Sequence, residues 1–221
     1  MTSLKHKMTL ADLTAAQVST LRTYQDLLWG FNQKINMISR DVTRDQLWER
    51  HVLHSLALTA RTFPHGTVMA DWGTGGGLPA IPVAIVLPNI TVFGVDAVGK
   101  KIQTVRAMAR RLGLGNLRAV HTRAEQFTTP IHYSISRATA PLAMLWQWHA
   151  RVAIPFEGQL TEDHWRPGLI CLKGGDLTAE IEDLHRAFAG LVVEQHLLPD
   201  FLNAPYFDEK GIIAVYRGRA T

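Results

Sequence analysis

The stretch of sequence that decides the fold is VMADWGTGGGLP, residues 68–79. An apolar run, typical of a buried strand, ends in Asp71, and four of the next six residues are glycine. Glycine lets the backbone turn sharply and approach a ligand with no Cβ in the way. Pro79 suits the first turn of a helix. The stretch therefore predicts a strand, a tight loop, and a helix whose positive amino terminus faces a bound group.

Two nucleotide cofactors are compatible with this loop. A dinucleotide loop follows G-x-G-x-x-G/A, and Gly75, Gly77 and Ala80 have that spacing. The other register, Asp-x-Gly-x-Gly-x-Gly, begins at Asp71 and resembles the first motif of the class I methyltransferases. In those enzymes the acid lies near the ammonium-bearing end of S-adenosylmethionine, whereas in a dinucleotide site it would repel the pyrophosphate. Asp71 therefore favours S-adenosylmethionine as the cofactor.

From Thr67 onward, short β-rich runs alternate with helical stretches. The expected strands span residues 67–72, 90–96, 117–121, 133–137, 169–173, 191–198 and 211–217. The expected helices span residues 79–86, 99–112, 141–152 and 177–189. This alternation predicts a parallel sheet covered by helices on both faces. Only a short, non-helical link joins the last two strands, so we expect them to pair as an antiparallel hairpin at the end of the sheet.

The first part of the chain, from about residue 9 to residue 61, has helical periodicity and no strand-like alternation. Two pairs resemble capped helix starts: Thr9 with Asp12, and Thr43 with Gln46. We expect an α/β fold, namely a doubly wound, Rossmann-like class I methyltransferase sheet with an N-terminal helical extension. The extension is expected to span residues 1–62 and the methyltransferase domain residues 63–221.

Composition excludes several classes of protein. The chain has 221 residues, of which 47% are hydrophobic, which suits one folded α/β domain with a modest extension and argues against disorder. Pro79, Pro82 and Pro88 interrupt the most apolar stretch, and no apolar run follows the basic start, so we expect neither a membrane helix nor a secretory signal. The single cysteine, Cys171, fits a cytoplasmic protein. The net charge of +4 permits a polyanionic partner.

Asp96 ends the second expected strand, at the edge where doubly wound sheets bind ligands. A carboxylate there can accept hydrogen bonds from both ribose hydroxyls of either cofactor, and the alternative role is a cap for the following helix. That helix carries apolar residues on one side. Basic residues lie largely on the opposite side: Lys100, Arg106, Arg110 and Arg111. A basic face of this kind is ordinarily exposed only to solvent. The more specific interpretation is that it contacts RNA phosphates.

Six segments together resemble the RsmG (GidB) family of bacterial 16S ribosomal RNA methyltransferases. The segments are NQKINMIS (residues 32–39), RHVLHSL (50–56), GTGGGLPAIP (73–82), DAVGKK (96–101), SRA (136–138) and LKGG (172–175). They occur in the order and at the intervals that this family shows. The glycine motif alone is generic, whereas GLPAIP and the SRA and LKGG pair are distinctive.

The resemblance implies methylation of guanine N7 in the decoding-centre loop of 16S rRNA, with S-adenosylmethionine as cofactor. It also implies a role for single positions: Asp71, Gly73, Gly75 and Leu78 at the methionine part, Asp96 at the ribose, and Ala124 with Glu125 at the adenine. Arg137 would reach the mouth of the active site, and Lys173 would face RNA. We expect the partner to be 16S rRNA or the 30S subunit, with no metal and no membrane, and we expect a cytoplasmic monomer.

The sequence departs from the family pattern at a few positions. Trp72 replaces a small aliphatic residue, Leu78 stands where phenylalanine is also common, and Ala80 replaces a glycine. Ala97 replaces a serine, and His54 replaces a frequent acid. Trp72 and Leu78 bear on the shape of the pocket, and His54 bears on any salt bridge expected at its position.

Three alternatives remain open from the sequence alone. One is a methyltransferase of the same fold that acts on another RNA, a protein or a small molecule, since fold does not fix function. The second is a non-catalytic RNA-binding protein with a vestigial cofactor pocket, and the third is a nicotinamide dehydrogenase. If guanine N7 is the target, no general base is expected, because N7 carries a lone pair and no proton. All ten histidines are then expected to be structural or solvated.

Overall fold

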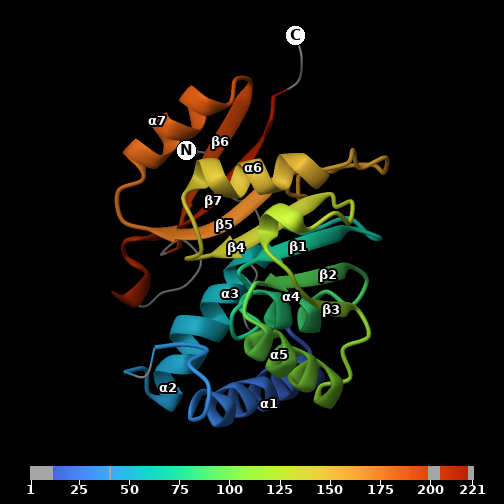
Figure 1. Cartoon of the computed structure of the whole chain (residues 1–221), viewed down its shortest axis with the longest axis vertical. Helices are drawn as coiled ribbons and strands as arrows, with labels where there is room; N and C mark the ends of the chain where they lie inside the picture. The colour runs from blue at the N-terminus through green and yellow to red at the C-terminus, as the bar shows by residue number, and fades with distance from the viewer. Residues whose placement is uncertain (1–11, 40, 199–204, 219–221) are drawn as a thin grey trace.

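A seven-stranded sheet forms the centre of the protein, with strand order β3-β2-β1-β4-β5-β7-β6 (Figure 1). The structure is a computed structural model, and it describes residues 12–39, 41–198 and 205–218. The strands are β1 (Val68–Trp72), β2 (Thr91–Asp96), β3 (Leu117–His121), β4 (Tyr133–Arg137), β5 (Leu169–Gly174), β6 (Leu191–Leu197) and β7 (Lys210–Arg217). The first five are parallel to one another, as the sequence predicted. This arrangement confirms the doubly wound α/β fold.

The last two strands form the expected antiparallel hairpin. Strand β7 also pairs antiparallel with β5, so the hairpin inserts its second strand between β5 and β6. The outermost strand on this side is therefore β6, and β7 is covered on both edges. The short link places the start of β7 beside the carboxyl end of β5, since Lys173 pairs with Gly211 and Gly174 with Lys210.

Helices cover both faces of the sheet because successive strand residues point to opposite sides. Met69 and Val92 join a buried cluster with α1 (Ala15–Asn32), α4 (Ala80–Val86) and α5 (Gly99–Arg111). The adjacent residues, Ala70 and Phe93, join a second cluster with α6 (Leu142–Val152) and α7 (Thr178–Ala187). Figure 1 shows α1, α4 and α5 on one side of the sheet and α6 and α7 on the other.

The N-terminal segment is helical, as the sequence predicted, and it is divided into several short elements after the first helix. Helix α1 ends at Asn32, whose side-chain oxygen accepts hydrogen bonds from the amides of Met37 (2.9 Å) and Ile38 (3.0 Å) and so turns the chain back on itself. Helical structure resumes as α2 (Arg44–Leu47), a π-helix η2 (Trp48–Leu53), α3 (His54–Leu56) and a 3₁₀ turn η3 (Ala57–Ala60).

One of the two predicted helix caps is confirmed. Thr43 and Gln46 form a reciprocal capping box at the start of α2. The other proposed cap began at Thr9, which lies outside the described residues. Helix α1 instead starts with a capping box between Thr14 and Gln17.

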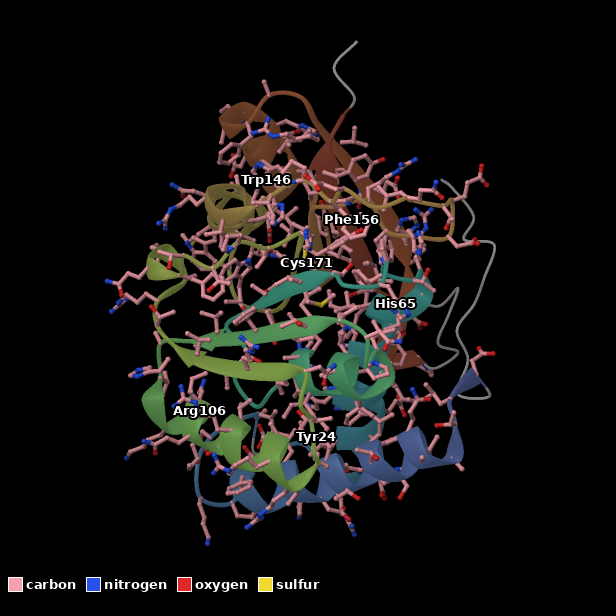
Figure 2. The ribbon with its side chains drawn as sticks, turned by 90° about the vertical axis from the view of Figure 1, so that its right-hand side faces the viewer. Tyr24, His65, Arg106, Trp146, Phe156 and Cys171 are labelled. Carbon is pink, nitrogen blue, oxygen red and sulfur yellow. The ribbon has the colours of Figure 1, made fainter. Side chains whose placement is uncertain are left out.

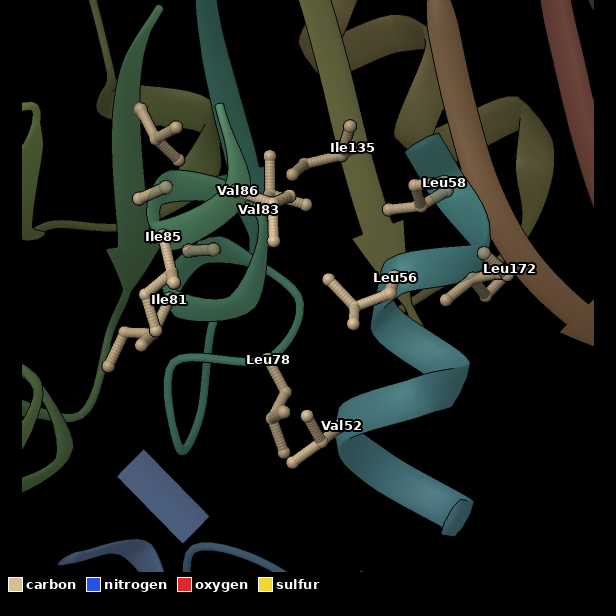
Figure 3. Packing of buried hydrophobic residues seen from close by; sticks show 14 of the residues in the cluster. Val52, Leu56, Leu58, Leu78, Ile81, Val83, Ile85, Val86, Ile135 and Leu172 are labelled. Atoms are coloured by element: carbon tan, nitrogen blue, oxygen red, sulfur yellow. The ribbon is translucent and has the colours of Figure 1, made fainter. Parts of the chain in front are cut away.

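The N-terminal helices share their hydrophobic core with the sheet and contact the glycine loop. The hydroxyl of Tyr24, buried on the sheet-facing side of α1 (Figure 2), donates to the carbonyl oxygen of Gly76 over 2.9 Å. A Cβ atom at Gly76 would lie 2.9 Å from Leu28, so the loop and α1 are in close contact. Figure 3 shows Leu78 of the loop facing Val52 of the π-helix. The extension therefore packs directly against the loop that the sequence marked as the ligand site.

No helix in the described ranges is long and apolar enough to cross a bilayer.

Replacing Tyr24 with Phe should destabilise the protein through this loop. The change leaves the ring in place and removes the hydroxyl that donates to the Gly76 carbonyl, so the free energy of unfolding should fall by about 1–3 kcal/mol. Denaturant unfolding of Tyr24→Phe measures this directly. Thr23→Ala, at an exposed position on the same helix, should stay within about 0.5 kcal/mol of the parent protein. Equal stability of the two variants would contradict the proposed contribution of this hydrogen bond.

Candidate functional site

Two adjoining cavities lie at the carboxyl ends of the parallel strands. The larger has a volume of about 550 Å³ and the smaller about 370 Å³. Four residues line both cavities: Gly73, Lys101, Ala138 and Thr139. The glycine loop therefore stands at the junction, where a doubly wound sheet binds its ligand.

The loop adopts a backbone that its glycines make possible. Gly73 and Gly75 have φ angles of 69° and 53°, in the left-handed region that side chains disfavour. A Cβ atom at Gly73 would collide with the side chain of Thr139. A Cβ atom at Gly75 would make only ordinary contacts, 3.8 Å from the carbonyl oxygens of Gly73 and Met37, and Gly75 lines the larger cavity.

Asp96 holds the loop from the end of β2. One carboxylate oxygen accepts a hydrogen bond from the amide of Gly75 (3.0 Å), and the other accepts one from the amide of Val98 (2.8 Å). The helix α5 begins after Val98 without a side-chain capping hydrogen bond, so Asp96 is not its cap, and Asp96 also lines the smaller cavity. A carboxylate has further lone pairs, which leaves acceptor capacity for ribose hydroxyls.

Asp71 does not line either cavity, contrary to the direct ligand contact that the sequence suggested. Its neighbours Ala70 and Trp72 point to the α6 side, so the Asp71 side chain points towards α4, where it accepts a hydrogen bond from the amide of Ala80 (3.1 Å). Complete burial raises the pKa of Asp71 to about 7, and hydrogen bonding and the positive charge of Arg137 partly oppose this rise. Asp71 thus anchors the helix that follows the glycine loop.

Arg137, at the end of β4, lines the larger cavity and is held by the π-helix. Its guanidinium donates to Nδ1 of His51 (2.7 Å) and to the carbonyl oxygen of Arg50 (3.2 Å). Segments of π-helix are frequent at functional sites, and here the wider turn directs a carbonyl and a ring nitrogen to one guanidinium. The N-terminal extension therefore fixes the orientation of the predicted active-site arginine.

Two histidines of the extension, His51 and His54, also line the larger cavity. Burial, and then the charge of Arg137, lower the pKa of each to about 3, so both rings are neutral near pH 7. Neither ring nitrogen of His54 has a partner in hydrogen-bonding geometry among the described residues. Its ring packs edge-on against Tyr206 and Phe207, with centroids 6.1 and 5.6 Å away. His54 faces cations where the family pattern has an acid, so no salt bridge forms from this position.

Lys173 lines the cavity, but its ammonium is not free to meet RNA. Its Nζ donates to Glu180 Oε2 and to the carbonyl oxygen of Ala140, both at 2.8 Å, and its side chain is only 11% exposed. A carboxylate on α7 therefore neutralises this ammonium in the structure, and the RNA-facing role of Lys173 stays a prediction. The neighbouring cation Lys210, which sequence reasoning missed, lines the same wall with Nζ 4.3 Å from the ring centroid of Tyr206.

The smaller cavity contains the positions expected at the adenine. Ala124 and Glu125 line it, in the 3₁₀ turn η4 (Ala124–Gln126) after β3. Trp148 of α6 lines another part of the wall and was not foreseen, because no strand end or glycine motif marks it. Trp72, the departure from the family pattern, is fully buried behind the cavity and packs edge-on against Trp148, with centroids 6.2 Å apart. The large residue at position 72 therefore supports the pocket wall from behind.

The basic residues predicted on α5 are all exposed: Lys100, Arg106, Arg110 and Arg111. They do not form one uniform stripe. Arg111 turns towards α1, with its guanidinium 5.7 Å from the ring of Phe31, whereas Arg106 turns towards β3 and donates to the carbonyl oxygen of Ala119 (2.9 Å).

The residues around the two cavities fit S-adenosylmethionine. The left-handed glycine loop leaves its backbone open to a ligand, and Asp96 has acceptor capacity on the side where a ribose would lie. Thr74 lines the larger cavity, and its buried hydroxyl interacts with the Asp71 carboxylate behind the loop.

Comparison with known proteins decides the family. Residues 17–205 match the family model described as rRNA small subunit methyltransferase G. This chain belongs to the rRNA small subunit methyltransferase G family. It is 52% identical to the ribosomal RNA small subunit methyltransferase G of Salinibacter ruber over 92% of this chain and 94% of that protein. It is 38% identical to the protein of the same name from Cytophaga hutchinsonii, over 92% and 94% of the two chains.

Solved structures of other class I methyltransferases share the fold of this family member. Magnesium protoporphyrin IX methyltransferase from Synechocystis superimposes with a TM-score of 0.60 over 94% of this chain and 99% of that chain, at 14% identity. Ribosomal protein L11 methylase from Lactobacillus delbrueckii gives 0.55 over 77% and 79%, also at 14% identity. Membership of the rRNA small subunit methyltransferase G family leaves the dehydrogenase interpretation of the glycine loop without support.

Asp96→Ala should weaken binding of S-adenosylmethionine about tenfold or more. The change removes the carboxylate that would accept from the ribose hydroxyls, and each buried donor left without an acceptor costs roughly 1–3 kcal/mol. Isothermal titration calorimetry measures the affinity, and circular dichroism checks that the variant is folded. Asp96→Asn keeps one oxygen for the Val98 amide and should recover stability without recovering affinity. Asp163→Ala, at an exposed acid, serves as the matched control. Unchanged affinity in Asp96→Ala would show that Asp96 only accepts from backbone amides and does not bind the ribose.

Buried neutral histidines should make the protein sensitive to acid. The unfolded chain protonates His54 near pH 6.5, whereas the folded chain keeps it neutral down to about pH 3, so its stabilising effect is complete above 6.5 and is lost progressively as the pH falls below that value. Protonation of His54 in the unfolded chain should lower the free energy of unfolding by about 2 kcal/mol at pH 5 relative to pH 7.5. Urea unfolding at both pH values should show a smaller loss for His54→Leu than for the parent protein.

The control for this measurement is His65→Gln, at an exposed position. Its loss of stability between pH 7.5 and pH 5 should match that of the parent protein. If His54→Leu also matched the parent, protonation of His54 would not be coupled to folding.

Proposed function

We propose that this protein transfers a methyl group from S-adenosylmethionine to N7 of a guanine in the decoding-centre loop of 16S rRNA. The observation that carries the proposal is the pair of adjoining cavities that meet at the glycine loop. The smaller cavity suits a nucleoside. The larger cavity is lined by cationic side chains and an aromatic ring. The relatives, which are ribosomal RNA small subunit methyltransferases G, indicate the substrate class.

We assign the cofactor-binding roles to residues that line the smaller cavity and its junction with the larger cavity. Asp96 would accept the ribose hydroxyls, and Ala124 with Glu125 would border the adenine. At the junction, Gly73, Gly75 and Leu78 would lie along the methionine part. Asp71 contributes through its hydrogen bond to the start of α4, since no cavity reaches its side chain.

The target guanine would enter the remaining part of the larger cavity. Arg137 would position the nucleotide from a fixed orientation, because His51 and the Arg50 carbonyl already hold its guanidinium. Lys210 and Tyr206 form the outer wall, so we assign to Lys210 the contact with RNA that the paired ammonium of Lys173 does not make. A cation beside an aromatic ring is suited to a nucleotide phosphate and base.

This chemistry requires alignment and no general base. Bound S-adenosylmethionine would supply a methyl group activated by its sulfonium, which the lone pair of guanine N7 can accept. Guanine N7 has no proton to remove. His51 and His54 are neutral, and Nδ1 of His51 is occupied by Arg137. The protein contributes by holding the reacting groups in line at close range.

The proposal extends to the setting of the reaction. The partner is 16S rRNA, free or assembled in the 30S subunit, and the protein acts in the cytoplasm as a monomer. An RNA substrate is consistent with the cationic outer wall.

Transfer of labelled methyl groups tests this function. Unmodified 30S subunits or 16S rRNA should accept label that nucleoside analysis identifies as 7-methylguanosine, and bulk tRNA should accept little. In single-turnover assays at saturating RNA and cofactor, the rate should vary less than about threefold between pH 6.5 and 9, since the two histidines that line the cavity stay neutral there and Asp71, with a pKa of about 7, lies outside the cavity.

The pH profile of RNA binding is measured in parallel, so that docking and the chemical step are separated. Label on tRNA alone would overturn the substrate assignment. A tenfold rise in rate with pH, abolished by changing one titratable side chain, would overturn the mechanism without a base and the choice of N7.

A further inference from the structure

The chain that follows β4 contains a strained residue at the methyl-transfer site. Ala138 has a φ angle of 52°, and in the part of the chain that the structure describes it is the only residue other than glycine with a positive φ. Residues with a Cβ atom disfavour this left-handed conformation, so the turn costs free energy that glycine would avoid. Strain of this kind persists only where the surrounding structure imposes it, and it is frequent at functional sites.

Ala138 lies where the two cavities meet. It lines both of them, whereas Arg137, the residue before it, lines the larger cavity and not the smaller one. In the proposed function the cofactor occupies the smaller cavity and the junction, and the guanine occupies the rest of the larger cavity. The methyl group then passes between them beside Ala138. The position of this turn therefore sets how closely the reacting groups approach each other.

Two hydroxyl groups tie the turn to the strand that precedes the glycine loop. The Thr139 hydroxyl donates to the carbonyl oxygen of Trp72, at the end of β1, over 2.8 Å. Ser136, on the other side of Ala138, donates to the same carbonyl oxygen over 3.1 Å. The Thr139 side chain also occupies the space where a Cβ atom of Gly73 would lie. The turn and the glycine loop are therefore fixed to each other.

A second restraint reaches the turn from β5 and α7, through the ion pair of Lys173 and Glu180. Lys173 Nζ donates to the carbonyl oxygen of Ala140 over 2.8 Å, and Glu180 Oε2 accepts from the amide of Leu142, at the start of α6, over 3.0 Å. The two side chains also pair with each other over 2.8 Å, so each fixes the other. Ala138 is therefore restrained on both sides, which is the condition under which a fold keeps a strained residue.

We propose that Ala138 is a positioning residue for methyl transfer, held in its strained conformation by Thr139 and by the Lys173–Glu180 pair. This inference rests on the proposed function and names the part of the chain that sets the spacing between cofactor and guanine. Glycine at this position would adopt the same φ without strain, but it would have many more conformations. Alanine keeps the turn rigid at some loss of stability, which suits a reaction whose rate depends on alignment.

The test is Ala138→Gly in the full chain. Because glycine removes the strain, the midpoint of thermal unfolding should stay the same or rise by up to about 4 °C. The single-turnover rate of methyl transfer to 16S rRNA, at saturating RNA and S-adenosylmethionine, should fall about tenfold because alignment is lost. The affinity for S-adenosylmethionine, measured by calorimetry, should stay close to that of the parent protein.

Ala150→Gly is the matched control, since Ala150 is exposed on α6 and lines neither cavity. Glycine inside a helix is destabilising, so the unfolding midpoint of this variant should fall by about 2–4 °C. Its rate of methyl transfer should stay that of the parent protein. The same substitution should therefore lower only the rate at position 138 and only the stability at position 150.

A double-mutant cycle tests the contribution of the ion pair. Glu180→Gln keeps an oxygen for the Leu142 amide and removes the charge that holds Lys173, so the rate should fall about threefold or more. Saturating RNA removes any gain in binding from the freed ammonium. In the Ala138→Gly background the same change should have little further effect, because the turn is no longer rigid enough to transmit the restraint.

The possible results differ for this inference and for the proposed function. A rate in Ala138→Gly equal to that of the parent overturns the inference, as does a fall in its unfolding midpoint equal to that of Ala150→Gly. Equal effects of Glu180→Gln in both backgrounds would show that the ion pair does not act through Ala138. A parent protein that methylates only an RNA other than 16S rRNA overturns the proposed substrate, and rates with that RNA still test Ala138.

Discussion

Two hydrogen bonds hold the glycine loop between β1 and α4 from opposite sides, and the geometry of the site depends on them. On one side Asp96 accepts a hydrogen bond from the Gly75 amide, and on the other Tyr24 donates to the Gly76 carbonyl. A loop with several left-handed glycines has a large conformational entropy to lose on folding. Two hydrogen bonds from elements far apart in sequence reduce that freedom and place the loop at the junction of the two cavities.

The N-terminal helices are part of the site and not merely an addition to the sheet. The π-helix carries Arg50 and His51, which orient Arg137 at the end of β4. Because burial keeps His51 neutral, its Nδ1 can accept from the guanidinium without adding charge to the cavity. This combination gives a fixed cation in the cavity wall and no group suited to take up a proton near neutral pH among the residues that line it. An arrangement of this kind serves a reaction limited by alignment.

The sequence by itself determined the elements and much of the cofactor side. Strand and helix periodicity, the glycine spacing and the turn residues act over a few neighbours, so the sheet with its closing hairpin could be predicted. Asp96 could be placed because every parallel strand ends at the same edge of the sheet, and the family resemblance placed Ala124 and Glu125 after β3, beside β2. The family motifs identified the protein because they lie in order along most of the chain.

Only the tertiary structure decided which side chains meet. Asp71 turns to α4 because alternation along β1 directs it away from the cavity, and Lys173 is neutralised by Glu180, a partner on the next helix. Tyr206 and Lys210 enter the wall because β7 inserts beside β5, which no local pattern reveals. Local sequence patterns report the hydrogen bonding and burial of one element. Contacts between charges and rings depend on how distant elements pack, and here that packing set the shape and charge of the pocket.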